Sequence, residues 1–299
     1  MAASCSIPRV SRRTFPTSDG VALSVLEAGR EHSGYRHLKI VFVPGWSMPA
    51  TLWRKQLEGL GGRYHVLAID PRGQGESQVP PGGYTAERRA TDLNEFLQSL
   101  WSPTGTHLGG NLEREPRAKA WARVEGSNVL LVGWSLGAIE SLQYVQMFGA
   151  DRLAGLVLVD SSVGEEPAPP AGGAFTQRLR EDRAQMLDEF VRAIFAKPRS
   201  EVEIASLVQQ AKRLPLEESI ALLSYPFERV HWRRIVHGFT KPLLYVVTPQ
   251  FEAQARNLQK NRPATQIEIF RDAGHALFVD EPERFHSLLA RFAARLASP

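Results

Sequence analysis

The feature that most constrains this chain is the segment Gly133-Trp134-Ser135-Leu136-Gly137, which directly follows the apolar run Asn128–Val132. A helix-compatible stretch begins behind it, so the serine is expected on a sharp strand-to-helix turn. Such a turn leaves no room for side chains two positions before or after Ser135, which explains the two flanking glycines. The helix would aim its free N–H groups and positive dipole end at an oxyanion formed beside the serine. The spacing therefore predicts a nucleophilic serine.

Three further segments each follow a strand-like run, namely Pro44–Trp46, Asp70–Ser77 and Asp272–His275. With the serine segment they resemble the α/β-hydrolase superfamily, in the order expected for it. They are similar to its oxyanion loop, its D-x-R-G-x-G-x-S turn and the loop that delivers its catalytic histidine. The resemblance spans about Val21 to Leu296. It implies an α/β fold, in which a mostly parallel central sheet has helices on both faces and a helical cap insertion.

Strand-like and helical stretches alternate along the chain, as in a parallel sheet that is covered on both faces. Several of the strand-like runs are almost continuously apolar, which is typical of strands buried on both faces. The predicted parallel strands are Lys39–Val43, His65–Ile69, Asn128–Val132, Leu153–Val159, Leu243–Val247 and Thr265–Phe270. Val21–Glu27 is expected as an edge strand, and residues 1–13 as a frayed arm. The predicted helices with apolar residues at helical spacing are Ala86–Leu100, Leu136–Phe148 and Pro282–Leu296.

Two segments interrupt this alternation within what we expect to be one domain, residues 1–299. Ser102–Ser127 has little to bury and is expected to form a long surface loop or to be partly disordered. The second segment, about 163–237, opens with a Pro-rich linker and continues with three amphipathic stretches. The resemblance implies that this segment is the cap, whereas its composition also suits surface helices with no role at the site. The three stretches are Phe175–Phe195, Glu201–Arg213 and Leu216–Ser224.

Serine is a weak nucleophile at neutral pH and needs a base within hydrogen-bond reach, with an acid that orients the base. His275 is the predicted base, because it follows the last strand at the carboxyl edge, where open α/β sheets bind ligands. His231 and His237 flank the exit of the cap and could line a pocket. His65 precedes a buried strand and is interpreted as structural.

The acid departs from the pattern of the family. The family normally places it after the strand that corresponds here to Leu243–Val247, but the expected offset holds Phe251. Glu252 stands one residue later and could instead favour the dipole of a following helix. Asp160 ends the preceding strand, where some relatives carry the acid. Both satisfy the order Ser, acid, His, and Asp160 is the favoured candidate.

Two backbone donors are needed for the oxyanion. The turn supplies the N–H of Leu136, and the resemblance assigns the second donor to the N–H of Trp46, although Pro44 replaces the usual histidine of that loop. The side chains of Trp46 and Trp134 are expected either to line an aromatic acyl pocket or to fill the core. The Asp70–Ser77 turn is interpreted as a structural brace for the oxyanion loop.

Composition excludes several other classes. The net charge of +4 lies partly in a low-hydrophobicity segment and does not form a patterned basic helix, so nucleic acid is not an expected partner. No phosphate-binding loop, dinucleotide motif or His/Cys ligand spacing is found, so no cofactor or metal is expected. No apolar run is long enough to span a membrane and no secretory signal is evident. The single cysteine, Cys5, suits a reducing compartment, so the expected location is the cytoplasm.

The resemblance implies a cofactor-free serine hydrolase that cleaves a small carboxylic ester through an acyl-enzyme, similar to esterases and cofactor-free haloperoxidases. Serine at position 135 argues against dehalogenase or epoxide hydrolase chemistry, which uses aspartate there. Cleavage of C–C bonds, lactones or amides and acyl transfer remain open with the same three residues. A catalytically slow ligand receptor on the same fold is the alternative from another class.

Overall fold

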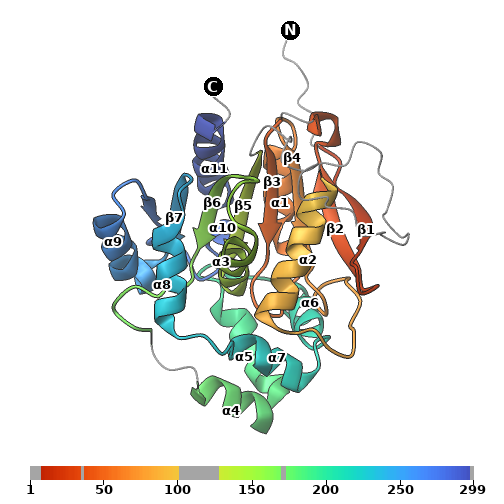
Figure 1. Cartoon of the computed structure of the whole chain (residues 1–299). Helices are drawn as coiled ribbons and strands as arrows, with labels where there is room; N and C mark the ends of the chain where they lie inside the picture. The colour runs from red at the N-terminus through yellow and green to blue at the C-terminus, as the bar shows by residue number, and fades with distance from the viewer. Residues whose placement is uncertain (1–7, 35–36, 101–127, 170–172, 297–299) are drawn as a thin grey trace, which may run out of the picture.

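The computed structural model describes residues 8–34, 37–100, 128–169 and 173–296. The predicted loop Ser102–Ser127 lies outside the described residues. An eight-stranded sheet runs through the centre in the order β1-β2-β4-β3-β5-β6-β7-β8 (Figure 1). Strands β3 to β8 are parallel to one another, whereas β2 is antiparallel to both of its neighbours, β1 and β4. The predicted α/β class is confirmed. The strands are β1 Ser11–Pro16, β2 Ala22–Ala28, β3 Lys39–Val43, β4 His65–Ile69, β5 Val129–Trp134, β6 Leu153–Val159, β7 Leu243–Val247 and β8 Gln266–Ile269.

The N-terminal prediction was wrong in two respects. Ser11–Pro16 pairs with β2 from Ser11 opposite Glu27 to Pro16 opposite Ala22, so β1 is the edge strand and β2 lies inside the sheet. Charged residues obscured the sequence pattern of a strand here, because three of the first thirteen residues are arginines. Edge strands commonly carry such charges, since they discourage pairing with another chain.

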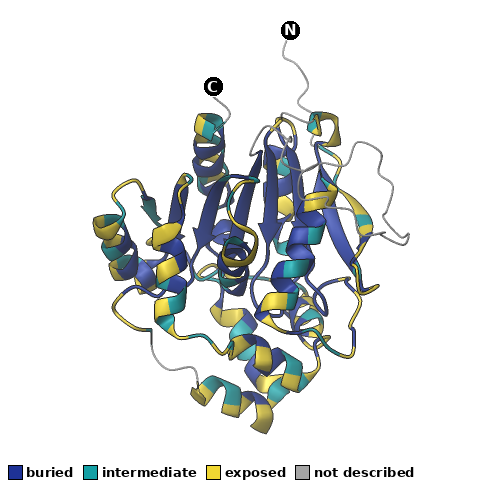
Figure 2. Ribbon diagram, in the orientation of Figure 1, coloured by how far each residue is buried: buried dark blue, intermediate teal, exposed yellow. Residues whose placement is uncertain are grey.

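Alternate residues of the central strands face opposite layers, which gives two cores. Ile40 and Val132 belong to the core covered by α1, α10 and α11, and Val41 and Leu131 belong to the core covered by α2, α3, α8 and α9. In Figure 2 the central strands are buried throughout, as a sheet covered on both faces requires. These helices are α1 Arg54–Leu60, α2 Ala86–Ser99, α3 Leu136–Phe148, α8 Arg229–Gly238, α9 Glu252–Asn261, α10 Leu277–Asp280 and α11 Pro282–Leu296.

The described residues between β6 and β7, where the insertion was expected, contain five helices. The amphipathic stretch Phe175–Phe195 forms two of them, because Asp182 caps a new helix by accepting from the N–H of Gln185. We call the first four helices, with their connections, the cap; in Figure 1 they lie at the lower end of the sheet. The fifth, α8, packs beside α3 on one face of the sheet. The cap consists of α4 Gly173–Glu181, α5 Arg183–Ala193, α6 Glu201–Ala211 and α7 Leu216–Leu223.

Candidate active site

Ser135 stands between the end of β5 and the first residue of α3, with φ 54° and ψ −119°. The two flanking glycines are required by space. A Cβ at Gly133 would lie 2.3 Å from the carbonyl oxygen of Gly137, and a Cβ at Gly137 would lie 2.4 Å from that of Val43. No side chain fits at either position, which is the packing that the sequence spacing predicted.

Backbone strain is concentrated around this turn. Three described residues other than glycine have positive φ, namely Ser47 at 58°, Ser135 at 54° and Asp160 at 42°. Each such residue costs about 1–3 kcal/mol and persists only where the surrounding structure imposes it. The three belong to the oxyanion loop, the serine turn and the end of β6. Their grouping makes the carboxyl edge of the sheet the candidate site.

His275 lies in the loop after β8 and pairs with Asp160. Its Nδ1 is 2.7 Å from Oδ2 of Asp160, whose side chain is fully buried. The other carboxylate oxygen, Oδ1, accepts from the backbone N–H of Thr248 at 2.6 Å and from its hydroxyl at 2.9 Å. With both donors of Thr248 on Oδ1, Oδ2 is the oxygen that pairs with the imidazole. Thr248 was not singled out in the sequence, although it directly follows β7.

Glu252, the alternative acid, lies in the first turn of α9. Its Oε1 accepts from Arg256 at 2.6 Å and from Arg271 at 2.9 Å. The hydrogen bond from Arg271, followed by that from Arg256, lowers the pKa of this carboxyl. In the structure Asp160 therefore contacts His275, whereas Glu252 is hydrogen-bonded to two arginines.

The serine turn and the histidine loop meet through Trp134. Its indole N–H donates to the carbonyl oxygen of His275 at 2.8 Å, and the two rings lie 5.2 Å apart between centroids. The oxyanion loop also packs against the serine turn, because a Cβ at Gly45 would lie 3.0 Å from Cβ of Ser135. All four predicted segments thus converge at the carboxyl edge of the sheet.

The turn Asp70–Ser77 supports the oxyanion loop through hydrogen bonds. The Gln74 side-chain amide donates to the carbonyl oxygens of Gly45 and Met48, each at 2.9 Å, and accepts from Arg89 at 2.9 Å. Arg89 also forms a buried ion pair with Glu140 of α3 at 2.7 Å. A chain of buried polar contacts therefore links the oxyanion loop to the helix behind Ser135.

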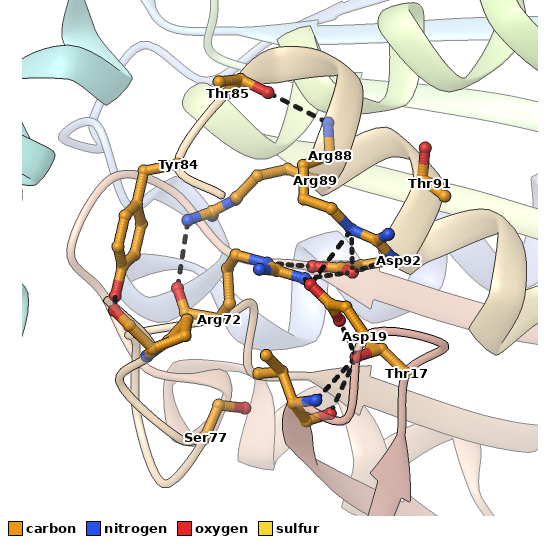
Figure 3. Close-up of polar contacts among 12 residues, drawn as sticks. Thr17, Asp19, Arg72, Ser77, Tyr84, Thr85, Arg88, Arg89, Thr91 and Asp92 are labelled. Atoms are coloured by element: carbon orange, nitrogen blue, oxygen red, sulfur yellow. Dashed lines mark hydrogen bonds and ion pairs between the residues drawn. The ribbon is translucent and has the colours of Figure 1, made fainter. Parts of the chain in front are cut away.

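Arg72 stabilises the same turn through ion pairs with two carboxylates. Figure 3 shows its guanidinium between Asp92 of α2 and Asp19, with distances of 2.6 Å to Asp92 and 3.0 Å to Asp19. Asp70 accepts from the backbone N–H of Ala50 at 2.6 Å. The contacts agree with the prediction that this turn serves as a brace.

The side chains of Trp46 and Trp134 are buried, and each donates a hydrogen bond to a backbone carbonyl oxygen. Trp46 donates its indole N–H to the carbonyl oxygen of Ser219 in α7 at 2.6 Å. Its ring packs edge-on against Phe175 and Phe190 of the cap, at 5.5 Å and 5.1 Å between centroids. Its exposed fraction is 3% and that of Trp134 is 1%. These contacts connect the oxyanion loop to the cap and favour the structural interpretation of both side chains.

The other three histidines considered in the sequence have different partners. His65 is buried against Glu27, as a structural residue should be, with 2.5 Å between Nε2 and Oε1. His231 stacks on Phe227 at 4.3 Å between centroids, and the ring nitrogen of His237 pairs with Glu165. Within residues 8–34, 37–100, 128–169 and 173–296, no three His, Cys, Asp or Glu side chains are grouped to hold a metal ion.

The family is settled by comparison with known proteins. The model of the alpha/beta hydrolase family matches residues 40–288. The chain belongs to this family. Among curated α/β-hydrolases, it is 26% identical to a pimeloyl-[acyl-carrier protein] methyl ester esterase of Vibrio vulnificus and 25% identical to that of Vibrio cholerae. Both alignments cover 86% of this chain and 94% of the relative.

Solved α/β-hydrolases have the same fold. A putative aryl esterase from Burkholderia cenocepacia superposes with a TM-score of 0.76 at 23% identity, covering 97% of this chain and 100% of that one. A bromoperoxidase from Bacillus anthracis also gives 0.76, at 20% identity, covering 94% and 99%. These two structures show the fold alone. The family match and the curated esterase relatives identify the chain as an enzyme of the α/β-hydrolase class. In the described part of the chain, no helix is long and apolar enough to cross a membrane.

Proposed function

We propose that this α/β-hydrolase cleaves a carboxylic ester by a serine acyl-enzyme route. The observation that carries the proposal is the contact of 2.7 Å between His275 Nδ1 and Asp160 Oδ2, beside a serine on a strained strand-to-helix turn. In the proposed triad Ser135 is the nucleophile, His275 the general base and Asp160 the acid that orients the imidazole.

Each step follows from these roles. Ser135 Oγ attacks the ester carbonyl carbon while Nε2 of His275 takes the hydroxyl proton. The tetrahedral intermediate then collapses, and the imidazolium gives that proton to the departing alkoxide, which leaves as the alcohol. Water, deprotonated by His275, then attacks the carbonyl carbon of the acyl-enzyme. The second tetrahedral intermediate collapses to the carboxylic acid, and the imidazolium returns the proton to the departing Oγ of Ser135. Asp160 remains ionised and stabilises the imidazolium in both halves.

The oxyanion of each intermediate is assigned to the backbone N–H groups of Leu136 and Trp46. Leu136 is the first residue of α3, whose N-terminal N–H groups have no partner within the helix. Trp46 lies in the loop that Gln74 holds against Ser135. A preorganised donor of this kind contributes roughly 3–4 kcal/mol to catalysis in a well-studied protease.

The substrate class is proposed from the curated relatives. The Vibrio relatives are named for the hydrolysis of a methyl ester, and the cap aromatics Phe175 and Phe190 lie over the oxyanion loop. We therefore assign this protein a small alkyl ester with an apolar acyl chain, over which the cap would form the pocket. Methyl butyrate and methyl hexanoate are the first natural-type substrates to test.

The deciding experiment treats the purified protein with a fluorophosphonate and measures turnover of p-nitrophenyl acetate and butyrate, with Ser135→Ala as the matched variant. We expect labelling of the wild type at one site and no labelling or turnover in Ser135→Ala. A folded wild-type protein that is neither labelled nor active would overturn the proposal. If such a protein were nevertheless stabilised against heat by small esters, the ligand-receptor alternative would replace it.

A further inference from the structure

The loop that carries His275 is attached to the cap on both sides of the histidine. The N–H of Ala276 donates to the carbonyl oxygen of Ile194 at 2.7 Å. On the other side, a Cβ at Gly274 would lie 2.6 Å from the backbone nitrogen of Ala196. Glycine at 274 therefore permits the loop to lie directly against the connection between α5 and α6.

A single carboxylate joins these two segments. Oδ2 of Asp280 accepts from the N–H of Gly274 at 2.9 Å and from the N–H of Ala196 at 2.8 Å. Oδ1 accepts from the N–H of Lys197 at 3.3 Å and from the guanidinium of Arg199 at 3.1 Å. One donor thus comes from the histidine loop and three come from the cap connection.

The surroundings make this contact a rigid one. The Asp280 side chain is fully buried, so no solvent competes for its oxygens. A buried carboxylate is tolerated only when its charge is paired and its oxygens are hydrogen-bonded, which the four donors provide. The ammonium of Lys197 adds a contact of 2.7 Å to the carbonyl oxygen of Asp280.

We propose that Asp280 is a positioning residue, which fixes His275 relative to the cap and so keeps the imidazole within hydrogen-bond distance of Asp160. The inference rests on the proposed function of Ser135 and His275. Because Gly274 and Ala276 both contact the segment 194–196, a displacement of this connection moves the histidine backbone. A base held through one hydrogen bond to Asp160 tolerates little displacement, since a misplacement of about 1 Å can cost on the order of 10²-fold in rate.

The primary test is Asp280→Asn, which keeps the size of the side chain but turns an NH₂ group toward N–H donors. We expect kcat for p-nitrophenyl butyrate to fall by about 10- to 100-fold per fluorophosphonate-labelled site, with KM within about threefold of the wild type. Hydrogen exchange should accelerate together at the amides of Gly274 and Ala196.

The matched control is Arg192→Met, which removes ion pairs of the cap to Asp188 and Glu201 but no donor to Asp280. We expect kcat of this variant to stay within about twofold of the wild type. If Asp280→Asn keeps the wild-type kcat, or if Arg192→Met loses as much, Asp280 is merely structural and the inference is wrong.

Two further measurements keep the test decisive. Should Asp280→Asn not fold, Asp280→Glu retains the charge and displaces both oxygens; a lower kcat supports the proposal and an unchanged one contradicts it. Should the wild type show neither labelling nor turnover, the proposed function fails. The contact itself is then judged by hydrogen exchange, and unchanged exchange at Gly274 in either Asp280 variant would refute it.

Discussion

Ser135 and Asp160 stand at the carboxyl ends of two neighbouring parallel strands, β5 and β6, and both have positive φ. The N–H of Ser135 donates to the carbonyl oxygen of Val159, one residue before Asp160, at 2.9 Å. The proposed nucleophile and the proposed acid are therefore held by adjacent strands, and their separation is set by the sheet. Of the three proposed triad residues, His275 is the one that a longer loop carries to the site, so its attachment to the cap matters.

The first prediction concerns the acid. Asp160→Asn should lower kcat by on the order of 10⁴-fold, because an amide that donates to Nδ1 leaves the imidazole in the wrong tautomer. Glu252→Gln should keep kcat within about twofold, since this carboxylate is engaged by Arg256 and Arg271. Steady-state turnover of p-nitrophenyl butyrate by the two variants provides the comparison. The opposite ranking would show that Glu252 is the acid.

The serine segment predicted more of the fold than any other part of the chain, because its spacing reflects hard contacts between backbone atoms. Gly133 and Gly137 admit no Cβ, so the strand, the turn and the helix follow from the sequence. The edge strand β1 could not be predicted in this way. Its stability comes from pairing with β2 rather than from its own apolar residues, and such non-local pairing leaves little trace in the pattern.

The acid could be narrowed only to two candidates from the sequence. Asp160 and Glu252 both precede His275 in the chain, and the choice depends on which carboxylate reaches Nδ1 in space. Asp280 was not predicted at all. It lies five residues beyond His275, but three of its four donors come from a cap connection about 80 residues away. A single sequence carries no record of such contacts.

The second prediction tests the brace under the oxyanion loop. Gln74→Leu removes the two hydrogen bonds to Gly45 and Met48. We expect kcat to fall by about 10- to 100-fold, less than or comparable to the loss of one direct oxyanion donor, with KM little changed. The affinity for a boronic acid, which forms a tetrahedral adduct with serine, should fall by a similar factor.

Gln78→Leu is the control for this substitution, because Gln78 is exposed, directly follows the same turn and accepts a hydrogen bond from the N–H of Ala22 rather than bonding to the oxyanion loop. It should leave both kcat and boronic acid affinity unchanged within about twofold. If Gln74→Leu lowers kcat but binds the boronic acid as tightly as the wild type, the loop does not organise the oxyanion site.

The third prediction concerns stability and pH. Burial alone would raise the pKa of Glu27, but the hydrogen bond from His65 and the charge of Arg13 outweigh it and the pKa is lowered. A folded-state pKa below the ordinary value of about 4.3 stabilises the fold above that value. The contribution is lost as the pH falls through the folded-state pKa. Glu27→Gln should lower the free energy of unfolding by about 1–3 kcal/mol at pH 7 and by less at acid pH.

Urea unfolding between pH 3 and pH 7 measures this difference. Glu58→Gln serves as the control, since its pairing with Arg54 is loose, at 3.7 Å, and partly exposed. Its effect should stay below about 1 kcal/mol at every pH. A loss in Glu27→Gln that is the same at all pH values would contradict the proposed ionic origin.

The fourth prediction separates space from backbone conformation at the serine turn. Gly137→Ala should lower the free energy of unfolding by about 2–4 kcal/mol, because the added Cβ would lie 2.4 Å from the carbonyl oxygen of Val43 and 2.6 Å from that of Pro44. Gly238→Ala is the matched control, since Gly238 ends α8 with no atom within 4 Å of the added Cβ. It should be neutral or stabilise by up to about 1 kcal/mol. Urea unfolding compares the two, and fluorophosphonate labelling reports the serine. Equal stability of the two variants would mean that the turn can open to admit a side chain, and the glycine would then serve chemistry rather than packing.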